Sequence, residues 1–150
     1  MRAGDTLAPT GDALSPTVQV LVDADNVGPP RLLPLLSALH DLAPTAVLVV
    51  AGHPAALDRT PWPDGARQLP AIGWQRADLA LAEAYRRDDQ PLILASGDGD
   101  FALLAAGHPG PVLVISSAPS YRLTQGSTVT DPALDGPQRL REWLTAVSDG

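Results

Sequence analysis

Five short apolar runs recur along this chain, separated by stretches with helical or loop character. They span residues 18–22, 45–50, 67–72, 92–95 and 112–116. Strands that are apolar along nearly their whole length are typical of a parallel sheet with helices on both faces. The runs therefore predict an α/β fold, a three-layer α/β/α sandwich with a mainly parallel central sheet of about five strands.

The segments between the runs predict the remaining elements. Helices are expected at residues 29–40, 78–87, 101–106 and 137–147, and a short edge strand at 128–130. The first helix is expected to start late or to bend at Pro34. Five of its leucines are expected to face inward: Leu32, Leu33, Leu35, Leu36 and Leu39. The proline-rich residues 51–65 are expected to form a surface loop.

Length and composition limit the classes of protein that this chain can represent. A chain of 150 residues can bury a sizeable core, and we expect a flexible leader at residues 1–16 and a single domain at 17–150. No apolar run approaches the roughly 20 residues of a membrane span, and without cysteine the chain has no disulfide or thiolate metal site. We therefore expect a cytoplasmic protein without membrane contact, and a homodimer stays open.

The net charge is −7, which argues against broad binding to a phosphate backbone, because such binding needs clustered cations. Divalent cations at a site built from several of the acids would cancel part of this charge. The objection to a nucleic-acid partner is therefore weakened but stands.

The most informative segment is Ser96-Gly97-Asp98-Gly99-Asp100, directly after the fourth run. It predicts a buried strand that ends in a tight glycine turn and carries two acids at its carboxyl end, where open α/β sheets bind ligands. The glycines leave room for backbone and ligand to approach, and Ser96 can hydrogen-bond a carboxylate or a ligated water. In the alternative, Asp100 is the N-cap of the next helix, which does not explain the glycines.

The first run ends in a similar way, in Asp23-Ala24-Asp25-Asn26. If the chain is still extended there, Asp23 and Asp25 share one side and suit catalysis or metal binding. In the alternative, these residues form a turn by bonding their own backbone. Asn26 is then either a turn-former or a residue that orients the first acid.

Asp78 opens a predicted helix, so it is either a metal ligand or an N-cap. Glu83 lies about 140° round that helix from Asp78 and is expected to be exposed. Arg76 and Arg31 are candidates for contacts with phosphate oxygens, or else surface charges.

These candidates offer oxygen ligands without a Cys/His cluster, which suits Mg²⁺ or Mn²⁺ and not a structural zinc. Crowded carboxylates raise one another's pKa, a cost that a metal ion relieves. Such sites mostly serve phosphoryl transfer or phosphodiester hydrolysis. The three histidines show no ligand spacing and are expected at the surface or in loops: His40, His53 and His108.

Three segments, residues 22–26, 76–82 and 96–101, resemble the three motifs of NYN domains, which belong to the PIN-like superfamily of metal-dependent ribonucleases. The resemblance covers about residues 18–131. It implies a parallel sheet between helices, Mg²⁺ or Mn²⁺ at the strand ends, and cleavage of RNA, which we expect to be single-stranded. It implies a catalytic, metal-binding set of Asp23, Asp78, Asp98 and Asp100, supported by Asn26 and Ser96. We add Asp25 as a supporting residue and Arg76 and Arg31 as substrate contacts.

The chain departs from the family pattern in three places. Ala84 stands where the family often carries a further Asp, and Gln75-Arg76 where it often has Lys-Gly. The usual helix between the second and third strands is reduced to the proline-rich loop. These differences imply a weakened or narrow activity.

Two other functions fit parts of the same pattern. A haloacid-dehalogenase-like phosphatase would use Asp23 as its nucleophile, but it normally needs a lysine, and the chain has none. A degenerate, non-catalytic NYN-like module that binds RNA or a protein would explain Ala84 and the acidic charge.

Overall fold

A six-stranded sheet forms the centre of the computed structural model, which describes residues 17–72 and 76–149. The strands are β2 (Gln19–Asp23), β3 (Val47–Gly52), β4 (Arg67–Pro70), β5 (Leu92–Ala95), β6 (Val112–Ile115) and β7 (Thr128–Thr130). They lie in the order β4-β3-β2-β5-β6-β7, and every neighbouring pair is parallel. The predicted leader, residues 1–16, lies outside the described residues.

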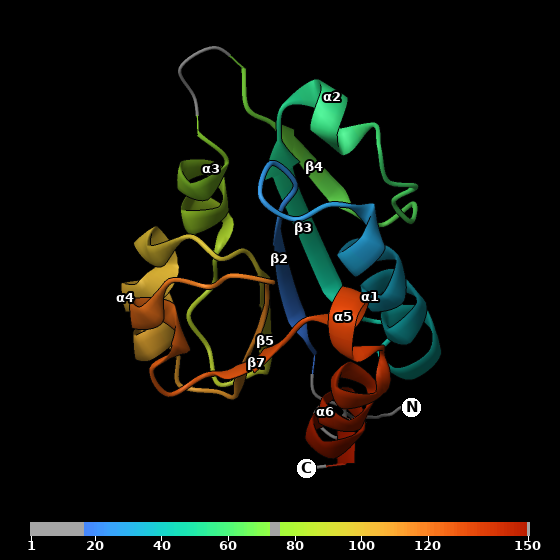
Figure 1. Ribbon diagram of the computed structural model, residues 1–150, viewed down its shortest axis with the longest axis vertical. Coiled ribbons are helices and arrows are strands. Elements are labelled where there is room, and N and C mark those ends of the chain that lie inside the picture. The colour runs from blue at the N-terminus through green and yellow to red at the C-terminus, as the bar shows by residue number, and fades with distance from the viewer. Residues whose placement is uncertain (1–16, 73–75, 150) are drawn as a thin grey trace, which may run out of the picture.

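Helices cover both faces of this sheet (Figure 1). One face carries α1 (Pro29–Leu42), α2 (Pro54–Leu57), α5 (Pro132–Asp135) and α6 (Gln138–Asp149). The other carries α3 (Ala77–Ala84), α4 (Ala102–Gly107) and the 3₁₀ turns η2 (Gly99–Phe101) and η3 (Tyr121–Thr124). The predicted α/β sandwich is confirmed, with six strands instead of about five.

The four central strands, β2, β3, β5 and β6, lack an apolar–polar alternation because both of their faces are buried. Successive side chains of a strand point to opposite faces. In β2, Val20 and Val22 accordingly belong to the core under α1, whereas Leu21 belongs to the core under α3. All three are fully buried.

Helix α1 does not start late, since residues Pro29–Leu42 are helical throughout, with Pro34 inside the helix. Pro34 lacks the N–H that would bond the carbonyl of Pro30, so the helix loses one backbone hydrogen bond near its start. The expectation for Leu33 is wrong, because this residue is 47 % exposed. The other four leucines are buried or partly buried against the core: Leu32, Leu35, Leu36 and Leu39.

Helix α3 ends at Ala84, three residues before the predicted end at Arg87. The side-chain amide of Gln19 explains the difference. It accepts a hydrogen bond from the backbone N–H of Arg86 and donates one to the Arg86 carbonyl, each at 2.9 Å. Because Gln19 is only 2 % exposed, its amide needs these partners. The chain therefore leaves the helix to pair with Gln19.

Two one-turn helices have no counterpart in the sequence prediction. Helix α2 buries Ala56 and Leu57 within the expected loop 51–65, and the Trp62 indole N–H donates to the Leu57 carbonyl at 2.8 Å. Helix α5 follows β7 directly. None of the helices within the described ranges has the length and apolarity to cross a membrane.

All three histidines agree with the expectation of surface or loop residues, since His40 and His53 are exposed and His108 lies in the loop after α4, where it is buried. The Nε2 of His108 lies 2.6 Å from the Gln90 carbonyl oxygen, which can only accept, so Nε2 carries the proton. The Tyr85 hydroxyl therefore donates to Nδ1, also at 2.6 Å. His108 thus holds the end of α3 to the loop before β5.

Candidate metal centre

Three carboxylates meet beyond the carboxyl ends of the central strands. Asp78 lies in the first turn of α3, and Asp98 and Asp100 follow β5. Each offers one oxygen, and the three oxygens lie within 4.8 Å of one another. The side chains are 10 %, 32 % and 57 % exposed in that order, so the group opens to solvent from a largely buried base. The three aspartates lie close enough together to bind a metal ion, and they are called the acid group below.

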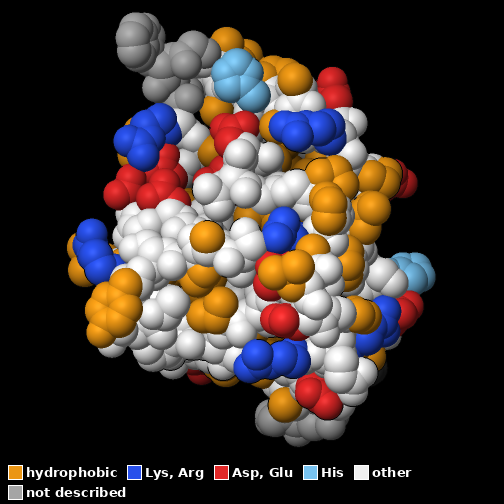
Figure 2. Space-filling model, in the orientation of Figure 1, with side chains coloured by type: hydrophobic (Ala, Val, Ile, Leu, Met, Phe, Trp, Pro, Cys, Tyr) orange, Lys and Arg blue, Asp and Glu red, His pale blue; other side chains and the backbone are white. Residues whose placement is uncertain are grey.

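Arg76 binds this acid group. Its Nη2 lies 3.0 Å from Asp78 Oδ2, 2.9 Å from Asp100 Oδ2 and 3.9 Å from Asp98 Oδ2. The charges of Asp78 and then Asp100 raise the pKa of the guanidinium. In Figure 2, acidic side chains gather beside a basic one on the upper left of the visible face, near α3. Arg76 thus forms ion pairs with carboxylates in this structure, whereas the sequence suggests that it contacts a phosphate.

Hydrogen bonds from backbone N–H groups to side-chain oxygens fix the loop that carries two of these acids. Asp98 Oδ1 accepts from the N–H of Asp100 at 2.9 Å and so caps the turn η2. The capping residue is therefore Asp98, and not Asp100 as in the alternative considered from sequence. Ser96 Oγ accepts from the N–H of Asp98 at 3.1 Å. These bonds hold the Asp98 carboxylate at the strand end.

Packing alone requires the two glycines of this loop. A Cβ at Gly97 would lie 2.5 Å from Ser116 Oγ, and one at Gly99 would lie 2.8 Å from Ser120 Oγ. The backbone also joins the two segments, because Ser120 N–H donates to the Gly97 carbonyl at 2.9 Å. The segment after β6 thus packs closely against the loop and restricts its movement.

Asp23, at the end of β2, lies outside the acid group. It is 6 % exposed, and burial, followed by the nearby charge of Asp25, raises its pKa to about 6. Its Oδ1 accepts from the N–H of Asp25 at 3.2 Å, and its Oδ2 lies 3.4 Å from the donor Ser96 Oγ. Ser96 therefore connects Asp23 to the loop that carries Asp98.

Asp25 and Asn26 form a turn and tie neighbouring strand ends together. The chain is no longer extended after Asp23, because the N–H groups of Asn26 and Val27 both bond the Asp23 carbonyl. Asp25 Oδ1 accepts from the N–H of His53, after β3, at 2.9 Å. Asn26 Oδ1 accepts from the N–H of Gly97, after β5, at 2.9 Å. Both side chains thus support the site by fixing the backbone around it.

Arg31 is held by an acid that the sequence did not single out. Its Nε lies 3.0 Å from Asp131 Oδ1, and its Nη2 donates to Asp131 Oδ2 at 3.0 Å. Burial disfavours the charge of Asp131, yet the hydrogen bonds from Arg31 and from the N–H of Ala133 keep its pKa below the usual value. The Asp-Pro pair that starts α5 was the available signal, since Asp is a common N-cap and Pro a common first helical residue.

Glu83 is exposed, as expected, and does not belong to the acid group. Ala84 is partly buried at the end of α3. Gln75, the other position where the chain departs from the NYN pattern, lies outside the described residues.

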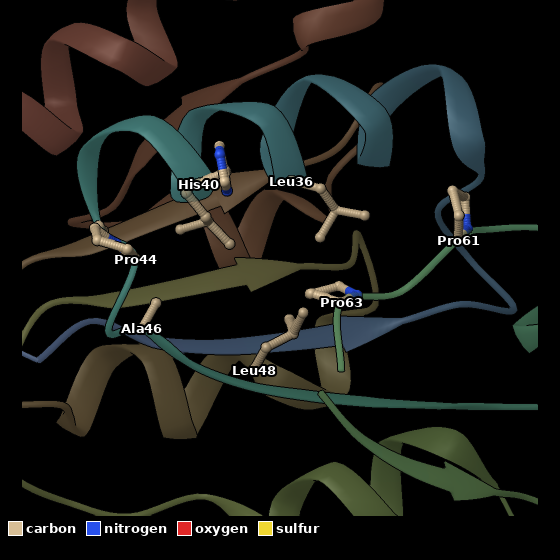
Figure 3. Close-up of a pocket in the computed structure, with 9 residues that line it drawn as sticks. Leu36, His40, Pro44, Ala46, Leu48, Pro61 and Pro63 are labelled. Atoms are coloured by element: carbon tan, nitrogen blue, oxygen red, sulfur yellow. The ribbon is translucent and has the colours of Figure 1, made fainter. Parts of the chain in front are cut away.

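A separate cavity of about 250 Å³ lies between α1 and the start of β3 (Figure 3). Leu36 and His40 of α1 line it together with Leu48 and the prolines of the segment before β4. This cavity lies where β3 starts, whereas the acid group lies beyond the carboxyl ends of the strands. The two therefore lie towards opposite ends of the strands. It is mainly apolar and does not belong to the candidate metal centre.

No protein-family model and no curated protein matches this chain in the comparisons made.

Proposed function

We propose that this protein is a metal-dependent ribonuclease that hydrolyses phosphodiester bonds of RNA. The convergence of Asp78, Asp98 and Asp100 carries the proposal, because it joins the start of α3 to the end of β5. The same two segments resemble the second and third NYN motifs. The residues that resemble the NYN motifs are thus the same residues that lie close together in the structure.

The donor set fits Mg²⁺ or Mn²⁺. Carboxylate oxygens are hard ligands, which these ions prefer, and no sulfur or imidazole takes part. Asp78, Asp98 and Asp100 would hold the ion. When bound, such an ion lowers the pKa of a water molecule and stabilises negative charge on a phosphate.

The surrounding residues keep this site in shape. Ser96 and Asn26 fix the loop before Asp98, and Asp23 is joined to it through Ser96. Arg76 is 60 % exposed at the rim, so its guanidinium can leave the carboxylates for a substrate phosphate. It therefore serves as the counter-ion of the acid group and as a substrate contact.

The direct test uses the purified protein, Mn²⁺ and a labelled single-stranded RNA. We expect cleavage that EDTA stops and that Asp98→Asn reduces by at least about 100-fold, since the loss of charge at one ligand weakens the ion's site. Asp64→Asn is the matched control, because Asp64 is exposed and lies outside the acid group. Cleavage that survives Asp98→Asn would contradict the proposed site.

A non-catalytic RNA- or protein-binding module is the second candidate. The bond from Arg76 to the acid group favours it, because a built-in cation already neutralises part of the site. RNA binding without cleavage at any Mn²⁺ concentration would support this candidate. The haloacid-dehalogenase-like alternative is disfavoured, because Asp23 is 6 % exposed and its oxygens lie on Asp25 N–H and Ser96.

A further inference from the structure

A groove of about 530 Å³ runs beside the acid group, between helix α3 and the edge strand β4. Arg76 lines one end of it and also binds Asp78 and Asp100, so the groove is continuous with the candidate metal centre. Its volume lies in the range of roughly 300–1,000 Å³ that is typical of small-ligand sites. It is called the α3–β4 groove below.

One wall of the groove is a stripe of α3. Leu79, Ala80, Glu83 and Ala84 line it, a spacing that places them along one side of a helix. The buried residues Ala77 and Leu81 lie on the side of the helix that packs on the sheet. Leu79 is 60 % exposed. Apart from the carboxylate of Glu83, this wall therefore offers apolar side chains to a ligand.

The opposite wall is β4, whose residues Arg67 and Leu69 point to the same face of the sheet as α3. Arg67 is exposed, and within residues 17–72 and 76–149 its side chain has no hydrogen bond or ion pair. Leu69 is partly buried against the core under α3. This wall thus pairs an uncommitted cation with an apolar side chain.

The groove therefore combines the free guanidinium of Arg67 and the carboxylate of Glu83 with apolar side chains, next to carboxylates that can hold a metal ion. An anionic ligand with a flat, less polar part fits this combination, and a nucleotide has both a phosphate and a base.

We propose that the α3–β4 groove binds the nucleotide adjacent to the scissile bond of a single RNA strand. Arg67 contacts its phosphate, and Leu79 with Leu69 contacts its base. This inference rests on the proposed ribonuclease function and adds the path of the strand. A volume of about 530 Å³ is the size of a small-ligand site and suits a single nucleotide.

The salt dependence of RNA binding tests this proposal. The Asp98→Asn protein binds a fluorescent single-stranded RNA in Mg²⁺, and its dissociation constant is measured at several salt concentrations. Adding Arg67→Gln is expected to weaken binding roughly fivefold and to reduce the slope of log K against log salt by about 0.7, the value for one lost phosphate contact on a single strand. Adding Leu79→Ser is expected to weaken binding several-fold without a change in slope.

Arg139→Gln is the matched control, since Arg139 is exposed on α6, on the other face of the sheet. If Arg67→Gln behaves like Arg139→Gln while the wild type cleaves RNA and Asp98→Asn does not, the groove is not the path of the strand and the ribonuclease proposal stands. If the wild type neither binds nor cleaves RNA, both proposals are wrong. We expect Arg67→Gln and Leu79→Ser to leave the melting temperature unchanged, since both residues are exposed. A large drop in the melting temperature of either variant would mean that its loss of binding comes from misfolding. That result would overturn the role assigned to the residue.

Discussion

Two arginines meet carboxylates beyond the carboxyl ends of the strands, and the two arrangements differ in charge balance. Arg31 faces the single carboxylate of Asp131, and the two side chains are 24 % and 8 % exposed. Arg76 faces three carboxylates and is itself 60 % exposed. Three negative charges against one positive charge leave two in excess at the acid group. The balanced pair stabilises the fold, whereas the unbalanced group retains affinity for a further cation.

Asp131→Ala should have the largest effect on stability. It leaves the partly buried Arg31 without its partner and removes the N-cap bond to Ala133, 3.0 Å long. We expect a loss of about 3 kcal/mol in the free energy of unfolding, measured by urea denaturation. Asp131→Asn keeps an acceptor for the cap and should lose about half as much. A loss below about 1 kcal/mol for Asp131→Ala would show that the pair is not structural.

Asp23→Asn should act in the opposite direction. Burial raises the Asp23 pKa to about 6 from 3.8, so the folded state holds a proton that the unfolded state releases. The free energy of unfolding therefore falls as pH rises from about 4 to about 6 and stays reduced above that range. Asp23→Asn removes this cost, and we expect a gain of about 2 kcal/mol at pH 7.5 in EDTA.

The pH dependence separates this cause from a general effect of lost charge. The gain from Asp23→Asn should shrink as pH falls below 6, because wild-type Asp23 is then protonated in the folded state. Asp64→Asn, on an exposed loop residue, should leave stability unchanged at every pH. Equal gains at pH 4 and pH 7.5 would contradict the raised pKa of Asp23.

The sheet could be predicted because its information is local. Four of the five runs form strands that are buried on both faces, β2, β3, β5 and β6, so a few consecutive residues specify each of them. The run at residues 67–72 forms the edge strand β4, which is mostly exposed. The end of α3 could not be predicted in this way. It depends on the amide of Gln19, which is 67 residues away from Arg86 in sequence. A helix pattern carries no sign of such a distant competitor for its backbone.

The candidate site shows the same division. Asp98 and Asp100 follow a strand directly, so their position at the edge of the sheet was predictable, and the resemblance to NYN motifs added Asp78. That Asp23 lies outside the acid group was not predictable, because it depends on how deeply β2 is buried. The ion pair of Arg31 was not predictable either, because its partner lies 100 residues further along the chain.

Arg76→Gln tests whether the acid group keeps spare affinity for cations. Because Arg76 Nη2 lies about as close to Asp78 and Asp100 as a hydrogen bond allows, it competes with a metal ion for the same oxygens. We expect the variant to bind Mn²⁺ about tenfold more tightly in a titration of the free protein. Arg139→Gln should leave Mn²⁺ affinity unchanged. Weaker Mn²⁺ binding by Arg76→Gln would mean that Arg76 supports the ion's site instead of competing for it.

Asp100→Asn should have the smallest effect on stability and so complete the contrast with Asp131. Asp100 and Arg76 are 57 % and 60 % exposed, and an ion pair between such exposed groups contributes little. We expect the free energy of unfolding in EDTA to change by less than about 0.5 kcal/mol, because the lost attraction to Arg76 is offset by reduced repulsion from Asp78 and Asp98. The same variant should bind Mn²⁺ more weakly than wild type. A loss of stability as large as that of Asp131→Ala would show instead that Arg76 and its three acids form a structural ion-pair network.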